Sequence, residues 1–60
     1  MSIGYDKETL TLEVEFHGGA TYQYNKVPEE IYLGLLGAGS VGRFFHEHIK
    51  NAGFTYKKIK

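Results

Sequence analysis

The chain has 60 residues, and its seven lysines and arginines balance its seven aspartates and glutamates, so its formal net charge at pH 7 is zero. This balance argues against a general electrostatic attraction to nucleic acids or membranes. The absence of cysteine excludes disulfides and thiolate metal sites. A chain of this length forms one domain, placed at residues 1–60, with a small core. It shows neither a signal peptide nor an apolar run that could span a membrane, so we expect a cytoplasmic protein.

The first half of the chain predicts three antiparallel strands joined as a meander. Between Leu10 and Phe16, apolar and polar residues alternate strictly, which is typical of a strand with one buried face. A polar turn on each side of this strand places neighbouring strands over residues 3–5 and 20–26.

The length of the turn between the second and third strands decides which face Tyr22 and Tyr24 occupy. A two-residue turn would place both tyrosines on the polar face, where they could stack on bases. A three-residue turn, with Gly19 in the left-handed conformation, pairs Val14 with Tyr22 and places both tyrosines on the apolar face. The second register buries more apolar surface, which stabilises a fold by about 25 cal/mol per Å². We therefore predict the three-residue turn, with the tyrosines in the core and their hydroxyls at its rim.

The middle of the chain predicts two short helices. Pro28 suits the first position of a helix, and the two glutamates after it lie at the positive end of the helix dipole. Gly37 and Gly39 predict that this helix ends in a left-handed cap. Ser40 then caps a second helix that runs to about Lys50. The apolar stripe of that helix consists of Val41, Phe44, Phe45, His48, Ile49 and Ala52.

Alternation returns at the C-terminus, where residues 54–59 predict an edge strand whose lysines protect the open edge of the sheet. Together these elements predict an α+β fold. Its parts are an antiparallel three-stranded meander, two short helices and a C-terminal edge strand.

Several short motifs resemble the KTSC domain, a family named after the C-termini of some lysyl-tRNA synthetases that also occurs as standalone proteins. They are Tyr22-x-Tyr24, Val27-Pro28, Ser40-x-Gly42-x-Phe44-Phe45, Ile49 and Tyr56, and they cover nearly the whole chain. The resemblance implies a small α+β domain, for which RNA binding has been suggested, and it supplies no catalytic residues. One departure is His46, where the family is expected to have asparagine.

The start of the second helix is a candidate site for an anion. Backbone N–H groups at a helix start have no partner within the helix, and Gly42 keeps side-chain bulk away from them. The guanidinium of Arg43 would add a charge-assisted hydrogen bond, and Tyr24 or Phe45 a stacking surface. The predicted ligand-binding residues are Ser40, Val41, Gly42, Arg43, Phe45, His46 and Tyr24. The alternative is that the glycines only form a turn and Ser40 only caps the helix.

Three other kinds of site do not fit the sequence. The spacing of glycines at residues 37–42 matches a dinucleotide-binding motif, but a helix precedes it where that motif requires a strand. His46 and His48 lie about 200° apart around a helix, so they cannot share a metal ion. Ser40 has no histidine or lysine placed to activate it. We therefore expect no enzymatic activity, metal or cofactor.

Three functions from different classes remain. The first is a binding module for a small, phosphate-bearing, nucleotide-type ligand, which could act by sequestering that ligand. The second is RNA binding, which the zero net charge disfavours. The third is a protein-interaction or assembly module. Because the core is small and rich in aromatic residues, we also expect a homodimer or a larger homo-oligomer.

Overall fold

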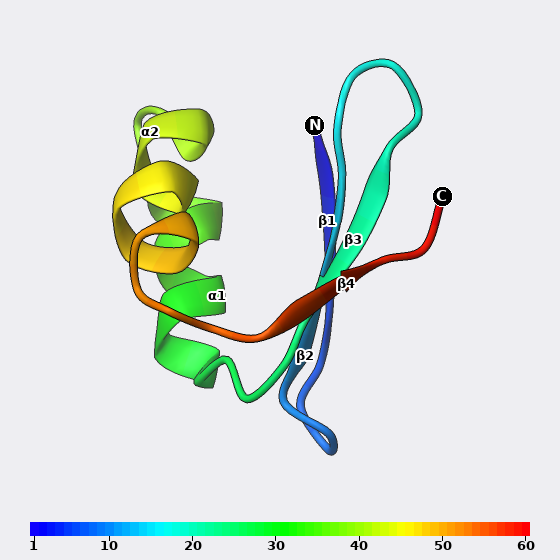
Figure 1. Cartoon of the computed structure of the whole chain (residues 1–60). Helices are drawn as coiled ribbons and strands as arrows, with labels where there is room; N and C mark the ends of the chain where they lie inside the picture. The colour runs from blue at the N-terminus through cyan, green and yellow to red at the C-terminus, as the bar shows by residue number, and fades with distance from the viewer.

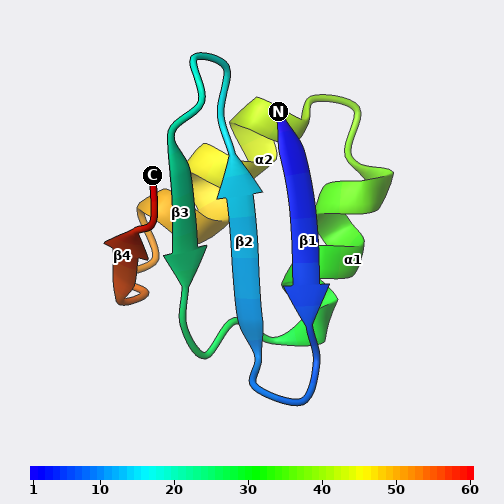
Figure 2. The same ribbon diagram turned by 90° about the vertical axis from the view of Figure 1, so that its right-hand side faces the viewer.

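The computed structural model describes residues 1–60, with one antiparallel sheet and two helical segments on one face of that sheet (Figure 1). The strands are β1 (Ser2–Asp6), β2 (Thr11–Glu15), β3 (Thr21–Tyr24) and β4 (Tyr56–Lys58). Their spatial order is β1-β2-β3-β4, and every neighbouring pair is antiparallel (Figure 2). The fold is thus α+β, and the C-terminal strand extends the predicted three-stranded meander to four strands.

The β2–β3 hairpin has the predicted register. Val14 lies opposite Tyr22, and the N–H of Phe16 donates to the carbonyl of Ala20 over 2.8 Å, which leaves a three-residue turn between them. Gly19 has a φ of 92°, a left-handed conformation that glycine adopts without strain. The register therefore places Tyr22 on the same face of the sheet as the apolar side chains of β2.

The first helical segment is α1 (Glu29–Gly37). The second consists of α2 (Val41–Phe45) and its π-helical continuation η1 (His46–Lys50). Ser40 caps α2 as predicted, because its hydroxyl accepts a hydrogen bond from the N–H of Arg43 over 3.4 Å. The second helix also ends near Lys50 as predicted. Its last turn is wider than an α-turn, and the N–H of Asn51 donates to the carbonyl of His46 over 3.2 Å.

The predicted ends of α1 need two corrections. Pro28 precedes the helix as its N-cap, so the helix begins one residue later, at Glu29. The left-handed caps expected at Gly37 and Gly39 are wrong, since neither glycine has a positive φ. Extended backbone at Ala38, with a ψ of 140°, ends the helix instead and leads the chain directly towards α2.

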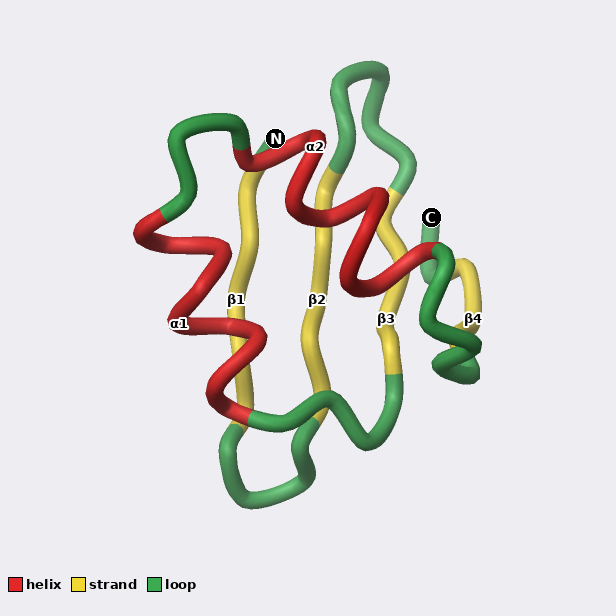
Figure 3. Tube along the Cα trace, turned by 90° about the vertical axis from the view of Figure 1, so that its left-hand side faces the viewer, coloured by secondary structure: helices red, strands yellow, loops and turns green.

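The core lies between the sheet and the helices. Figure 3 shows α1 in front of β1, and α2 crossing in front of β2 towards β3. The buried apolar residues are Leu12, Val14, Tyr24, Val27, Leu35, Phe45 and Ile49. His48 and Ala52, which were expected in the apolar stripe of the second helix, are exposed. The ring of His48 packs on the half-buried Phe44 with 4.2 Å between ring centroids, so it covers that side chain from the solvent side.

The outer side of α1 carries exposed apolar side chains. Leu33 is 55% exposed and Leu36 is 58% exposed. They are three positions apart in the sequence, so they share one side of the helix. The expected homo-oligomer stays a prediction.

We predict that Gly34→Ala destabilises the fold, because a methyl group at this position of α1 would overlap the ring of Phe44 on α2. Overpacking costs about 1–3 kcal/mol and outweighs the roughly 1 kcal/mol that alanine gains over glycine in a helix. The matched control is Gly37→Ala in the same helix, where a methyl group meets nothing within 4 Å. Urea unfolding should show a lower free energy of unfolding for Gly34→Ala alone. Equal values for the two variants would contradict the prediction.

Candidate functional site

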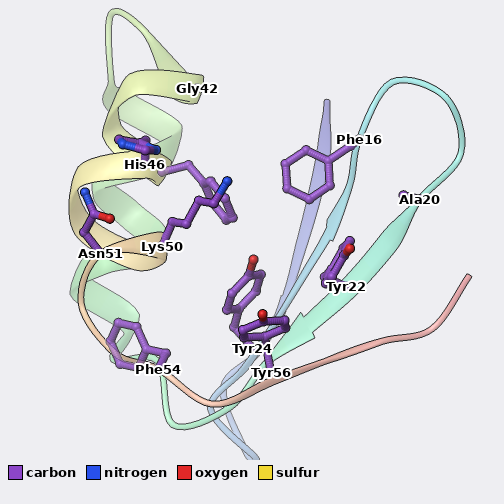
Figure 4. Close-up of a pocket in the computed structure, with 11 residues that line it drawn as sticks. Phe16, Ala20, Tyr22, Tyr24, Gly42, His46, Lys50, Asn51, Phe54 and Tyr56 are labelled. Atoms are coloured by element: carbon purple, nitrogen blue, oxygen red, sulfur yellow. The ribbon is translucent and has the colours of Figure 1, made fainter.

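A groove lies between the α2–η1 helix on one side and strands β3 and β4 on the other (Figure 4). Its volume is about 840 Å³, within the range of small-molecule sites. The residues that line it are Phe16, Ala20, Tyr22, Tyr24, Gly42, Phe45, His46, Lys50, Asn51, Phe54 and Tyr56. Six of these are phenylalanine or tyrosine, so the lining is mainly aromatic.

Three tyrosines form the sheet side of the groove. Tyr22 and Tyr24 share one face of β3 because side chains alternate along a strand. The β3–β4 register places Tyr56 directly opposite Tyr24, with 5.2 Å between ring centroids. The ring of Tyr22 lies 5.8 Å from that of Tyr56. Because Tyr56 is 59% exposed, this aromatic surface opens to solvent at the edge of the sheet.

One side of the helix forms the opposite wall. Gly42, His46 and Lys50 recur every four residues and therefore lie on the same side of the α2–η1 helix. Phe45 closes the base of the groove between the two walls. Its ring meets the ring of Tyr24 edge-on, with 5.4 Å between centroids. The groove is thus a cleft with an aromatic side, a polar side and a packed floor.

The charge of the groove is positive. Lys50 is the single lysine or arginine among the lining residues, and no aspartate or glutamate lines the groove. Burial raises the pKa of Tyr24 above its ordinary value of 10.0, and the neighbouring phenols of Tyr56 and Tyr22 act in the same direction. Tyr24 is therefore a neutral hydroxyl at pH 7, able to donate a hydrogen bond.

The structure brings four of the seven predicted ligand-binding residues into this groove: Tyr24, Gly42, Phe45 and His46. Ser40, Val41 and Arg43 do not line it. The Nε of Arg43 lies 3.2 Å from an oxygen of Glu47, and its side chain is 80% exposed. A ligand contact by Ser40, Val41 or Arg43 stays a prediction.

Seven lining residues were not among the predicted ligand-binding residues: Phe16, Ala20, Tyr22, Lys50, Asn51, Phe54 and Tyr56. A signal for Lys50 was present, because it follows Gly42 and His46 at helical spacing. A signal for Tyr56 was also present, because the side chains of the C-terminal segment alternate between two faces. Once that segment pairs with β3, the alternation places Tyr56 on the same face as Tyr24.

The structure shows no cluster of three or more histidine, aspartate or glutamate side chains that could bind a metal ion. Neither helical segment has the length and hydrophobicity that a membrane span requires.

Comparison with known proteins finds consistent relatives. The sequence profile of the KTSC domain matches residues 1–54. The crystal structure of a KTSC domain protein from Yersinia pestis superposes with a TM-score of 0.84 at 39% identity, over 100% of this chain and 83% of that one. An uncharacterized protein of Stutzerimonas stutzeri is 47% identical over 58 residues, which cover 97% of this chain and 82% of that protein. A lysine–tRNA ligase of Trichormus variabilis is 40% identical over 55 residues, which cover 92% of this chain but 10% of the ligase.

The raised pKa of Tyr24 predicts how stability changes with pH. The unfolded chain loses its phenolic proton at a lower pH than the folded chain, so the free energy of unfolding falls as pH rises above about 10. Tyr24→Phe should make this fall shallower. Burial also raises the pKa of Tyr5, so part of the fall remains. Urea unfolding between pH 9 and 11 measures the slope, and equal slopes for the two proteins would contradict the assignment.

Proposed function

This chain belongs to the KTSC domain family, and we propose that it is a non-catalytic binding module for a small, phosphate-bearing, nucleotide-type ligand. The observation that carries the proposal is the groove between α2–η1 and β3–β4, which combines an open aromatic surface with a positive charge. Aromatic side chains stack on the flat faces of bases, and a lysine attracts phosphate.

The arrangement of the tyrosines suits a flat ring. Tyr56 is mainly exposed while its partner Tyr24 is buried beneath the groove, so a ring can cover Tyr56 without displacing the core. The absence of a carboxylate from the lining means that an anion meets no repulsion there. The volume of about 840 Å³ also fits a ligand of this size.

The lining supports binding more than chemistry. A catalytic nucleophile is usually hydrogen-bonded to a base, and His46 and Lys50 make no side-chain hydrogen bond to any other residue of the groove. A domain that holds its ligand unchanged lowers the free concentration of that ligand. We therefore propose sequestration as its mode of action, in the cytoplasm, where nucleotides are abundant.

The test is a thermal-shift screen against nucleotides, cyclic nucleotides and short RNAs, followed by calorimetric titration of the compound that stabilises the protein most. Tyr56→Ala should weaken binding of that compound about 5- to 150-fold, because stacking on one aromatic side chain contributes about 1–3 kcal/mol. Tyr56 is 59% exposed, so the variant should remain folded.

The matched control is Leu33→Ala, which removes a side chain of similar exposure, 55%, on α1 outside the groove. It should bind like the parent protein. If Tyr56→Ala binds unchanged, the aromatic groove is not the site. If Arg43→Ala then loses affinity, the result would indicate that the anion binds at the start of α2.

RNA binding is the second candidate, favoured by the similarity to a lysine–tRNA ligase, a protein that by its name acts on tRNA. The residues that would contact phosphates on this chain are Lys57 and Lys58 of β4 and Lys60, all of them exposed. This function predicts affinity for single-stranded RNA that falls steeply with salt.

Replacing these three lysines by alanine should reduce the slope of log K against log salt by about 2, since each phosphate contact in a single strand contributes about 0.7. Fluorescence polarisation with a short labelled RNA at several salt concentrations measures the slope. An unchanged slope would exclude this surface as an RNA interface.

A further inference from the structure

Tyr24 combines a buried ring with a hydroxyl that has no partner in the chain. Its side chain is the most buried among the five tyrosines, with an exposed fraction of 6%. The hydroxyl of Tyr5, by contrast, donates a hydrogen bond to the carbonyl of Val27. Figure 4 shows the Tyr24 hydroxyl directed into the groove, on the side where the helix lies. The structure holds no buried side-chain oxygen without a partner, so this hydroxyl is open to the groove and free to donate a hydrogen bond to a ligand atom.

Lys50 reaches the same space from the opposite wall. Its side chain extends from the end of η1 into the groove, with its amine directed towards Phe16 (Figure 4). No salt bridge holds its ammonium group, since Arg43 and Glu47 form the ion pair of this chain. The side chain is therefore free to pair with a negative charge brought in by a ligand.

We propose that the Lys50 ammonium and the Tyr24 hydroxyl together bind a single phosphate group, so that the ligand is a nucleoside monophosphate whose base stacks on Tyr56 and Tyr22. The inference rests on the proposed function and deepens it, because it assigns the anion to the space between Lys50 and Tyr24 and limits the ligand to one phosphate. An ammonium and a neutral hydroxyl both donate charge-assisted hydrogen bonds to phosphate oxygens.

The stacking surface lies next to this pair of donors. The ring centroids of Tyr56 and Tyr22 lie 5.2 Å and 6.4 Å from that of Tyr24, so a base on these rings places its attached phosphate near the Tyr24 hydroxyl. The polar side chains of His46 and Asn51 on the helix wall are available for the edge of the base.

The number of charges argues against a polyphosphate. Lys50 is the single lysine or arginine that lines the groove. The guanidinium of Arg43 is paired with Glu47. A second and third phosphate would therefore enter the groove without a cation to balance them, and their mutual repulsion would oppose binding.

The experiment is calorimetric titration of adenosine, AMP and ATP, and of the three guanine counterparts, into the parent protein and four variants. Lys50→Met and Tyr24→Phe each remove one proposed donor and keep most of the side chain. Lys57→Met and Tyr32→Phe are the matched controls, because neither residue lines the groove. Circular dichroism checks that each variant is folded.

One nucleoside monophosphate should bind the parent protein at least tenfold more tightly than its nucleoside. Lys50→Met and Tyr24→Phe should each weaken binding of the monophosphate about 10- to 100-fold and leave the affinity for the nucleoside unchanged. The two controls should bind both compounds like the parent. As a second readout, the phosphorus resonance of the bound monophosphate should shift less with Lys50→Met than with the parent protein.

The results separate this inference from the proposed function. If Tyr56→Ala loses affinity for the monophosphate but Lys50→Met and Tyr24→Phe do not, the groove binds nucleotides and the assigned phosphate position is wrong. If the triphosphate binds tenfold more tightly than the monophosphate, the limit to one phosphate is wrong. If none of the six compounds binds the parent protein, both the inference and the proposed function fail.

Discussion

The register of the β2–β3 hairpin is the constraint on which the groove depends. Val14 lies opposite Tyr22, and Leu12 lies opposite Tyr24, so the apolar side chains of β2 and the tyrosines of β3 face the helices together. A slip by one residue would move both tyrosines to the open face of the sheet. The core would lose Tyr24, and the groove would lose its aromatic side. The same pairing therefore determines the core and the candidate site.

Local patterns in the sequence predicted the features that local chemistry decides. Strict alternation and the burial it allows predicted the pairing of Val14 with Tyr22, and side-chain chemistry predicted the cap at Ser40. The left-handed caps at Gly37 and Gly39 were wrong because glycine permits that conformation without requiring it. The backbone conformation between α1 and α2 is determined by the way the two helices pack together. That packing is a tertiary constraint, which local sequence patterns do not contain.

The candidate site was predicted in part for the same reason. Gly42 was identified because it lies at the helix start, His46 because it stands where the family is expected to have asparagine, and Tyr24 because it could stack on a base. Tyr56 arrives from the other end of the chain through β3–β4 pairing, and Lys50 lies on the same side of the helix as Gly42 and His46. The spacing of each residue carried a signal, but the groove forms only when the helix and β4 both pack beside β3, so neither residue was assigned to the site.

The groove is left open by the sizes of the residues at its upper end. Ala20 and Gly42 lie there, one near the β2–β3 turn and one on the helix, where larger side chains could fill the space (Figure 4). Filling the space would bury more apolar surface. Such burial would stabilise this domain, whose core holds seven buried apolar residues. The open groove therefore costs stability. A flat ligand on Tyr56 would cover surface that the chain leaves exposed, and because it binds the folded state, it would raise the free energy of unfolding by an amount that grows with its affinity and its concentration. On the proposed function, the ligand thus completes the packing of the fold, and stability and binding are linked through the same aromatic side chains.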